Sequence, residues 1–183
     1  IDIFLESLHF CRQYLLDRGN LRGAVRTQCA DSGRRIPLED ASIDCIVTSP
    51  PYANTMDYYL YHKQRMNVLG YDFKSAQNTE IGSRWEYSSL KRPLAEWEAQ
   101  YRHSLREMRR VLRKGALCVL VMGDSQVAGK LVDAAAMTRE FAQDAGFDVE
   151  GVESVDMRDR SRSFSRGFQR PHKKEHTITL RAV

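Results

Sequence analysis

The sequence has few cysteines and no long apolar run, and both absences exclude classes of protein. Its four cysteines, Cys11, Cys29, Cys45 and Cys118, are widely spaced and form no CxxC pair. A disulfide framework or a zinc site is therefore not expected, and a reducing cytoplasm fits. His62, His103 and His172 show no metal-ligand spacing, so no other metal site is expected either. The longest apolar stretch, residues 117–122, is too short to cross a bilayer, and no signal peptide is visible. We therefore expect a cytoplasmic protein with no membrane partner.

Length, composition and charge are those of an ordinary globular domain. The chain has 183 residues, of which 42% are hydrophobic and 28% are charged. A chain of this length can bury a substantial core, so one domain over residues 1–183 is expected. The net charge of +4 is compatible with a nucleic-acid partner without requiring one.

Hydrophobic periodicity predicts strands that alternate with helices. An α/β fold follows, with a mainly parallel sheet, helices on both faces and a C-terminal antiparallel strand. The segment 70–93 has no clean period and predicts a long loop, and 158–174 is a basic insert between the last two strands. Helices are predicted at 2–18, 56–69, 94–113 and 132–145, and strands at 24–29, 43–48, 116–122, 147–157 and 176–183.

Three polar segments follow three of the predicted strands. Asp31 follows the first, residues 49–52 follow the second, and residues 123–125 follow the strand at 116–122. Ligands of open α/β sheets bind beyond the carboxyl ends of the strands. The sequence therefore predicts that these segments share one site.

The second of these segments, Ser49-Pro50-Pro51-Tyr52, stands out. Neither proline has a backbone N–H and both have a fixed φ, so the strand ends in a stiff turn whose carbonyl groups can accept hydrogen bonds. A polar side chain stands before the turn and an aromatic ring after it, an arrangement that can hold a planar group with an NH2. An ordinary strand-ending turn and a polyproline ligand are the alternative interpretations.

The segment Thr48-Ser49-Pro50-Pro51-Tyr52 resembles the catalytic motif of the DNA amino-methyltransferases, which use S-adenosylmethionine. The serine form is similar to that of cytosine-N4 enzymes, whereas adenine-N6 enzymes more often carry Asp or Asn at that position. The likeness covers most of residues 24–183, is sharpest over 29–71, and includes segments 30–31, 36–44, 53–58 and 69–71. It implies a Rossmann-like methyltransferase fold, S-adenosyl-L-methionine as cofactor, DNA as partner and a restriction–modification setting.

The resemblance also implies roles for the motif and for the upstream segment. Ser49 and the Pro50 carbonyl would accept hydrogen bonds from the target amine, and Tyr52 would stack on the base. Asp31 matches the acidic residue that contacts the cofactor adenine, with Ala30 and Thr48 beside the cofactor. A loop-capping role is the alternative for Asp31.

Further residues are candidates for contact with the nucleic acid. Asp57 and Tyr58 follow the motif and would shape the base pocket, although core packing explains Tyr58 equally well. Asp124 would either line that pocket or cap the next helix. The basic insert offers phosphate contacts from Arg162, Arg166 and Arg170, with a solvated loop as the alternative interpretation.

Two features of the resembled family are absent. The family has a Gly-rich turn of the Phe-x-Gly-x-Gly kind and an acidic residue for the cofactor ribose, and this sequence has neither. We expect the first βαβ unit to precede residue 1, so that the domain is N-terminally incomplete, or else to come from another chain. The alternatives to cytosine-N4 methylation are adenine-N6 methylation, an RNA base methyltransferase, and a non-catalytic nucleic-acid-binding subunit of open oligomeric state.

Overall fold

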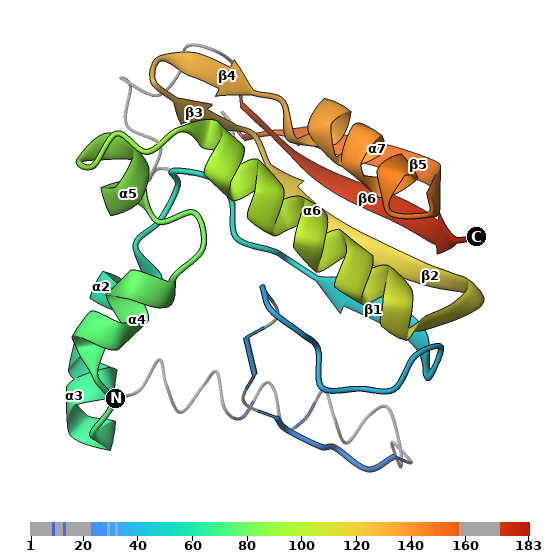
Figure 1. The fold of residues 1–183 in the computed structure, drawn as a ribbon, viewed down its shortest axis with the longest axis horizontal. Coiled ribbons are helices and arrows are strands. Elements are labelled where there is room, and N and C mark those ends of the chain that lie inside the picture. Colours follow the sequence, from blue (N-terminus) through green and yellow to red (C-terminus); the bar gives the residue numbers. More distant parts are fainter. Residues whose placement is uncertain (1–8, 10–12, 14–22, 29, 32, 158–172) are drawn as a thin grey trace.

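The computed structural model describes residues 9, 13, 23–28, 30–31, 33–157 and 173–183 (Figure 1). It has a mixed α/β fold in which residues 43–182 supply the helices and strands below. In chain order these are β1 Ile43–Thr48, α2 Tyr58–Tyr61, α3 Lys63–Leu69, α4 Phe73–Thr79, α5 Arg84–Ser88, α6 Leu94–Val111, β2 Leu112–Gly123, β3 Ser125–Val127, β4 Lys130–Val132, α7 Ala134–Asp144, β5 Phe147–Asp156 and β6 Lys174–Ala182.

Four strands form the main sheet, in the order β1-β2-β6-β5. β1 pairs with β2 in parallel, and β6 is antiparallel to both β2 and β5. Three strands therefore run in one direction and β6 runs against them. The predicted antiparallel pairing of the last two strands is confirmed, but the sheet is mixed rather than mainly parallel by pairing.

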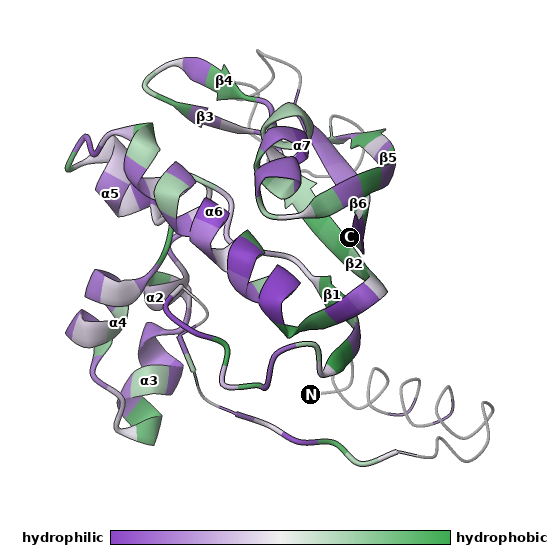
Figure 2. Cartoon of the chain, turned by 45° about the vertical axis from the view of Figure 1, so that its right-hand side comes forward, coloured by the Kyte–Doolittle hydropathy of each residue, from purple (hydrophilic) through white to green (hydrophobic). Residues whose placement is uncertain are grey.

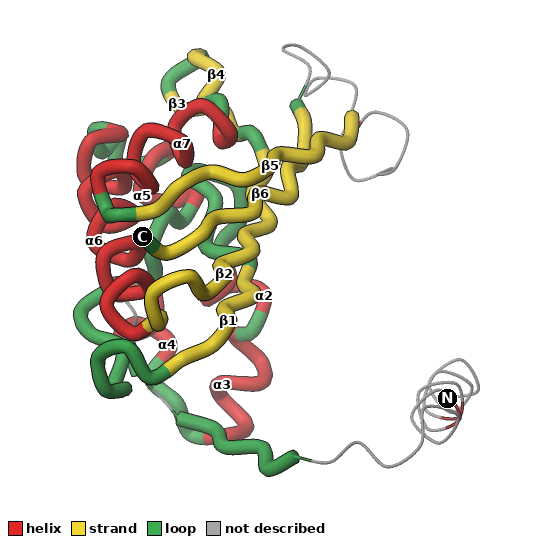
Figure 3. Tube along the Cα trace, turned by 90° about the vertical axis from the view of Figure 1, so that its right-hand side faces the viewer, coloured by secondary structure: helices red, strands yellow, loops and turns green. Residues whose placement is uncertain are grey.

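The core lies between the sheet and two helices, α6 and α7, on the same face (Figures 1 and 3). Trp97, Tyr101, Leu105 and Met108 recur every three or four residues along α6 and are all buried, so they form the inner stripe of an amphipathic helix. The outward side of α6 is hydrophilic (Figure 2). Alternate residues of the central strands meet this stripe and are fully buried: Cys118, Leu120, Met122, Ile178 and Leu180.

The opposite face of the sheet is open at β1. Val47 is 73% exposed there, and the Cys45 thiol beside it is also exposed. Helices were expected on both faces of the sheet. In the described part of the chain, α6 and α7 cover one face, and the other is open at β1. No helix within that part combines the length and the apolarity needed to cross a bilayer.

The strand and the helix predicted before residue 30 are not found among the described elements. Residues 24–28, predicted as part of a strand at 24–29, are irregular and exposed, and they pair with none of the described strands. Position 29 and nearly all of the predicted helix at 2–18 lie outside the described residues.

The segment predicted as a loop, 70–93, contains the two short helices α4 and α5. Asp72 begins α4 by accepting a hydrogen bond from Lys74 N, and Ser83 begins α5 by accepting one from Glu86 N. Side-chain caps of this kind satisfy amide groups that a helix start leaves unpaired. The predicted helix at 56–69 is likewise divided, at His62, into α2 and α3.

A small hairpin, β3–β4, was not predicted. Its two-residue turn has positive φ at both positions, 49° at Ala128 and 79° at Gly129. Positive φ at two central residues is the geometry that joins antiparallel strands most tightly. The hairpin follows the carboxyl end of β2 and therefore lies near the predicted site.

Candidate functional site

The Ser-Pro-Pro-Tyr turn leaves the carboxyl end of β1, where the sheet has its parallel pair. Ser49 is exposed, whereas Pro50, the next residue, is buried. Trp97, 2% exposed on α6, donates from Nε1 to the Pro51 carbonyl over 3.2 Å. No residue in the described ranges donates to the Pro50 carbonyl. The turn is thus anchored from the core side and presents a serine hydroxyl outward.

Tyr52 joins the turn to the neighbouring strands. Its hydroxyl lies 3.2 Å from Ser49 Oγ, 3.2 Å from the Val121 carbonyl and 3.2 Å from Glu175 Oε1. Burial raises the pKa of the phenol; the hydrogen bond with Ser49 lowers it in part, and the charge of Glu175 raises it further. Tyr52 is therefore a neutral phenol at ordinary pH, and its proton serves one of the acceptor oxygens around it.

The Tyr52 ring packs closely against Gly123. A Cβ at position 123 would lie only 2.7 Å from Tyr52 Cε2, so the ring needs the glycine. This contact brings the carboxyl end of β2 to the turn after β1. Two of the three segments that the sequence assigned to one site, 49–52 and 123–125, therefore meet.

Asn54 holds the chain just after the motif. Its φ is 54°, a left-handed value that Asn tolerates better than most residues. Its Nδ2 donates to the Gln126 carbonyl over 2.6 Å, and its Oδ1 accepts from Ser88 Oγ over 2.9 Å. The motif is thereby tied to both β3 and α5. The sequence placed Asn54 in the family-like segment 53–58, near the cap of the helix predicted at 56–69, but did not predict these contacts.

Asp57 and Tyr58 lie at the start of α2. Asp57 accepts a hydrogen bond from Trp85 N at 2.8 Å, and Tyr58 is 44% exposed. The first turn of α2 is capped by Glu80, whose two carboxylate oxygens accept from the backbone N–H groups of residues 58 and 59, each at 2.8 Å. Burial raises the pKa of Glu80, and these two hydrogen bonds lower it in part. Asp57 thus has a structural partner, and the Tyr58 ring remains accessible.

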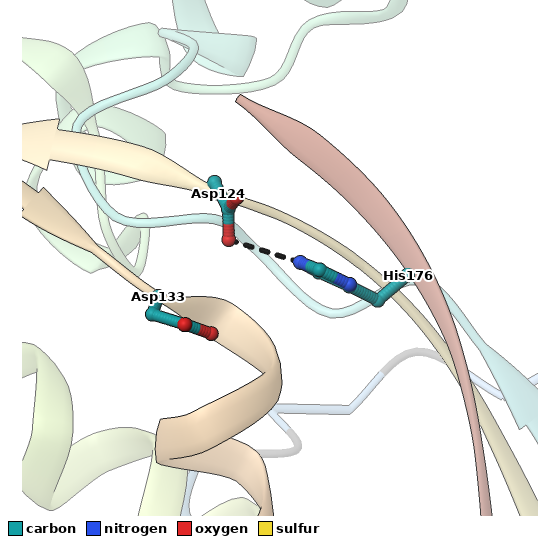
Figure 4. Close-up of side chains that lie close together, drawn as sticks. All are labelled: Asp124, Asp133 and His176. Atoms are coloured by element: carbon teal, nitrogen blue, oxygen red, sulfur yellow. Dashed lines mark hydrogen bonds and ion pairs between the residues drawn. The ribbon is translucent and has the colours of Figure 1, made fainter. Parts of the chain in front are cut away.

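Asp124 holds three elements together. Its oxygens accept from Ala134 N at 3.0 Å and from Lys174 N at 2.9 Å, and its Oδ1 lies 3.0 Å from His176 Nε2 (Figure 4). The carboxylate therefore joins the end of β2, the start of β6 and the start of α7. Since Asp124 is only 8% exposed, these bonds favour the capping alternative over contact with a base.

Asp124, Asp133 and His176 also have ligand atoms within 4.8 Å of one another. Each of these side chains already has a partner. Asp133 caps α7 by accepting from Ala136 N at 2.8 Å, and His176 Nδ1 lies 2.8 Å from Ser154 Oγ. A network of satisfied groups accounts for this cluster without a bound ion.

Asp31 lies in an exposed turn, and Ala30 beside it is exposed too. The Asp31 carboxylate accepts from Gly33 N at 2.9 Å and pairs with Arg34 at 3.4 Å. These contacts are those of a loop-capping aspartate. The turn is nevertheless near the site, because a Cβ at Gly33 would lie 2.8 Å from Ile81, which lines the cavity described next.

A cavity of about 320 Å³ lies beside the motif. Thr48, Ser49 and the two prolines form one wall, and the buried stripe of α6, with Trp97, forms another. Its lining is mostly apolar with a few polar groups, which is typical of small-molecule sites. Thr48, which the resemblance places beside the cofactor, is one of the residues that line this cavity. Arg162, Arg166 and Arg170 lie outside the described residues.

Comparison with known proteins gives a likeness at the level of fold. No protein-family model and no curated protein matches the sequence. A provisionally named DNA modification methylase from Thermus thermophilus, solved with S-adenosyl-L-methionine, is similar with a TM-score of 0.50 and 20% identity over 83% of this chain. A SAM-dependent methyltransferase from Methanosarcina mazei is similar with a TM-score of 0.50 and 8% identity over 90% of this chain.

This chain spans about half of the Thermus protein, 53% of its length, and 70% of the Methanosarcina protein. Identities this low show the fold alone. The described part of the chain therefore has a mixed α/β fold, built on a four-stranded mixed sheet, that resembles part of the Rossmann-like methyltransferase fold.

Proposed function

We propose that this chain is part of an S-adenosylmethionine-dependent methyltransferase that acts on the exocyclic amino group of a DNA base, cytosine N4 in particular. The observation that carries the proposal is the Ser-Pro-Pro-Tyr turn at the carboxyl end of β1 in a methyltransferase-like sheet. Ser49 is exposed, and the Pro50 carbonyl, which follows it in the chain, accepts no hydrogen bond from the described residues, so both groups are candidate acceptors.

The hydrogen-bond pattern around Tyr52 suits Ser49 to this task. The Val121 carbonyl and the Glu175 carboxylate can only accept, so the Tyr52 proton goes to one of them. The Tyr52 oxygen can then accept the Ser49 proton across their 3.2 Å contact. Ser49 keeps its lone pairs for an amine N–H from outside.

An aromatic amine is a poor nucleophile because its lone pair is delocalised into the ring. Hydrogen bonds from the NH2 to Ser49 and to the Pro50 carbonyl would fix its position and favour tetrahedral nitrogen. Oriented dipoles of this kind act without a covalent intermediate. S-adenosylmethionine, when bound, supplies the methyl group. In duplex DNA the target base must first leave the helix, and the Tyr52 ring would then stack on it.

The residues of this chain fit the cofactor only in part. Thr48 and the cavity beside β1 can hold one side of it. The Asp31 carboxylate is turned toward Gly33 and Arg34, and the sequence has no Phe-x-Gly-x-Gly turn. The remaining contacts have to come from other residues. Support for this cofactor is the solved complex of the Thermus protein.

The test compares Ser49→Ala with Ser75→Ala, a matched change on the exposed surface of α4. Transfer of labelled methyl groups to DNA and to RNA is measured for this chain and for the chain extended upstream in its reading frame. Ser49→Ala is expected to lower kcat about 100-fold, the usual effect of losing one oriented polar group at a reaction centre. Ser75→Ala is expected to have no effect. Full activity of a folded Ser49→Ala protein would refute the role of Ser49, and transfer to RNA alone would refute DNA as the substrate.

A further inference from the structure

A second hollow lies on the other side of Asn54, between α5 and the β3–β4 hairpin. These two elements are neighbours in the ribbon views (Figures 1 and 2). The hollow, here named the α5–hairpin cleft, has a volume of about 860 Å³. Its polar lining includes Asn54, Ser88 and Gln126, and its charged lining consists of Arg84, Lys91 and Lys173.

The charge of the cleft has one sign. Three cationic side chains line it, and no carboxylate is among its described lining residues. Arg84 and Lys91 are exposed, and neither side chain makes an ion pair or hydrogen bond with another described residue. Burial lowers the pKa of Lys173, although the Asp124 carboxylate raises it in part. An anion in the cleft would offset the repulsion among these groups.

The walls of the cleft are fixed before any ligand arrives. Asn54 bridges them, with its amide nitrogen bonded to the Gln126 carbonyl of β3 and its amide oxygen bonded to Ser88 of α5. Lys91 is held at a φ of 55°, in the left-handed region. Preorganised walls lose little entropy when a ligand binds.

The position of the cleft indicates which anion it suits. Asn54 lines it and follows Tyr52 by two residues, so the cleft adjoins the turn that would hold the target base. Its volume is in the range that accommodates groups much larger than a single phosphate ion. A polynucleotide strand presents phosphates at regular spacing on either side of any base, and lysine and arginine neutralise them.

We propose that the α5–hairpin cleft binds backbone phosphates of the nucleic-acid strand next to the base held at Ser49–Tyr52. This inference rests on the proposed function for the identity of the ligand. Phosphate contacts position a strand without reading its sequence. The cleft therefore contributes affinity and register, and its effect is the same for every flanking sequence.

The test measures binding of a fluorescein-labelled DNA duplex by anisotropy at several salt concentrations. The variants are Arg84→Gln, Lys91→Gln and the double variant. Arg106→Gln, which removes the same charge from the exposed side of α6, is the control. Each single cleft variant is expected to bind about tenfold more weakly, as for the loss of a charge-assisted hydrogen bond, and the double variant about 100-fold more weakly. The slope of log K against log salt should fall by about 1 in each single variant and by about 2 in the double variant.

Three results would overturn the inference. The first is an unchanged salt slope in the double variant, and the second is a loss of duplex affinity in Arg106→Gln as large as in the cleft variants. The third is a loss of affinity for pyrophosphate, measured by competition, that equals the loss of affinity for the duplex. Thermal unfolding followed by circular dichroism checks that the variants fold, and binding of an RNA of the same sequence tells whether the cleft prefers DNA or RNA.

Methyl transfer separates the two proposals. If the wild type transfers no methyl group but the salt slopes change, the cleft stands and the proposed function falls. If transfer is normal in the double variant, with KM unchanged, the cleft inference falls alone.

Discussion

The packing of Tyr52 on Gly123 makes one substitution especially informative. Gly123→Ala would place a Cβ 2.7 Å from Tyr52 Cε2 and 3.0 Å from Cδ2, closer than real carbon contacts allow. The ring has to move away from β2. Its hydroxyl would then leave the Val121 carbonyl and Glu175, and Ser49 would lose the partner that orients it.

The expected magnitude is a balance of two terms. Alanine in place of glycine in a strand normally stabilises a protein by about 0.5–1 kcal/mol, because it restricts the unfolded chain. Overpacking opposes this by about 1–3 kcal/mol. The midpoints of these two ranges give a net loss of about 1 kcal/mol, which lowers Tm by about 2–4 °C in a chain of this size.

Gly151→Ala in β5 is the matched control, because a Cβ there meets nothing within 4 Å. Urea denaturation followed by circular dichroism gives the free energy of unfolding of each variant. Gly151→Ala is expected to leave it unchanged or to raise it slightly. In a Tyr52→Ala background the penalty of Gly123→Ala should disappear, since the obstructing ring is gone. Equal stability of Gly123→Ala and Gly151→Ala would refute the packing of Tyr52 described here.

Two further predictions concern the framework of the site. Asp124→Asn gives the three donors around that side chain one acceptor oxygen fewer, so it should lower stability by about 1–3 kcal/mol. Asp133→Asn, the control, keeps a good helix cap and should change little; similar denaturation midpoints for the two variants would contradict the role of Asp124 in joining β2, β6 and α7. The hydrogen-bonded Arg110 lowers the pKa of Glu107 from 4.5 to about 2. Because the pKa is lower in the folded state, the contribution of this pair to the free energy of unfolding is complete above about pH 4.5 and is lost as the pH falls toward 2. Glu107→Gln should therefore reduce stability at pH 7 and flatten its pH dependence between those values, and an unchanged acid limb in denaturation curves would contradict this.

Elements whose own residues specify them could be predicted from the sequence. β1 is a short run rich in β-branched residues that two prolines end, and α6 carries an apolar stripe at helical spacing, so local pattern and burial agree. The short helices α4 and α5 were missed, although a signal was present. Ser83 and Glu86 have the spacing of a capping box, which predicts the start of a helix.

The connections of the site could not be predicted in this way. Tyr52 and Glu175 are 123 positions apart, and Asn54 and Gln126 are 72 apart, so their contacts exist only after the sheet has formed. Asp124 shows the same limit. The sequence left capping and base contact equally open, and the cap is favoured only by contacts with residues far along the chain, Ala134 N at the start of α7 and Lys174 and His176 in β6.

The most direct measurement is the identity of the methylated nucleoside. DNA is incubated with S-adenosylmethionine and the upstream-extended chain, digested to nucleosides and analysed by mass spectrometry. The account predicts N4-methyldeoxycytidine in the wild-type reaction and its loss in Ser49→Ala. Absence of any methylated base, although the protein is folded and binds the cofactor, would contradict the account, and so would methylation of ring carbon alone.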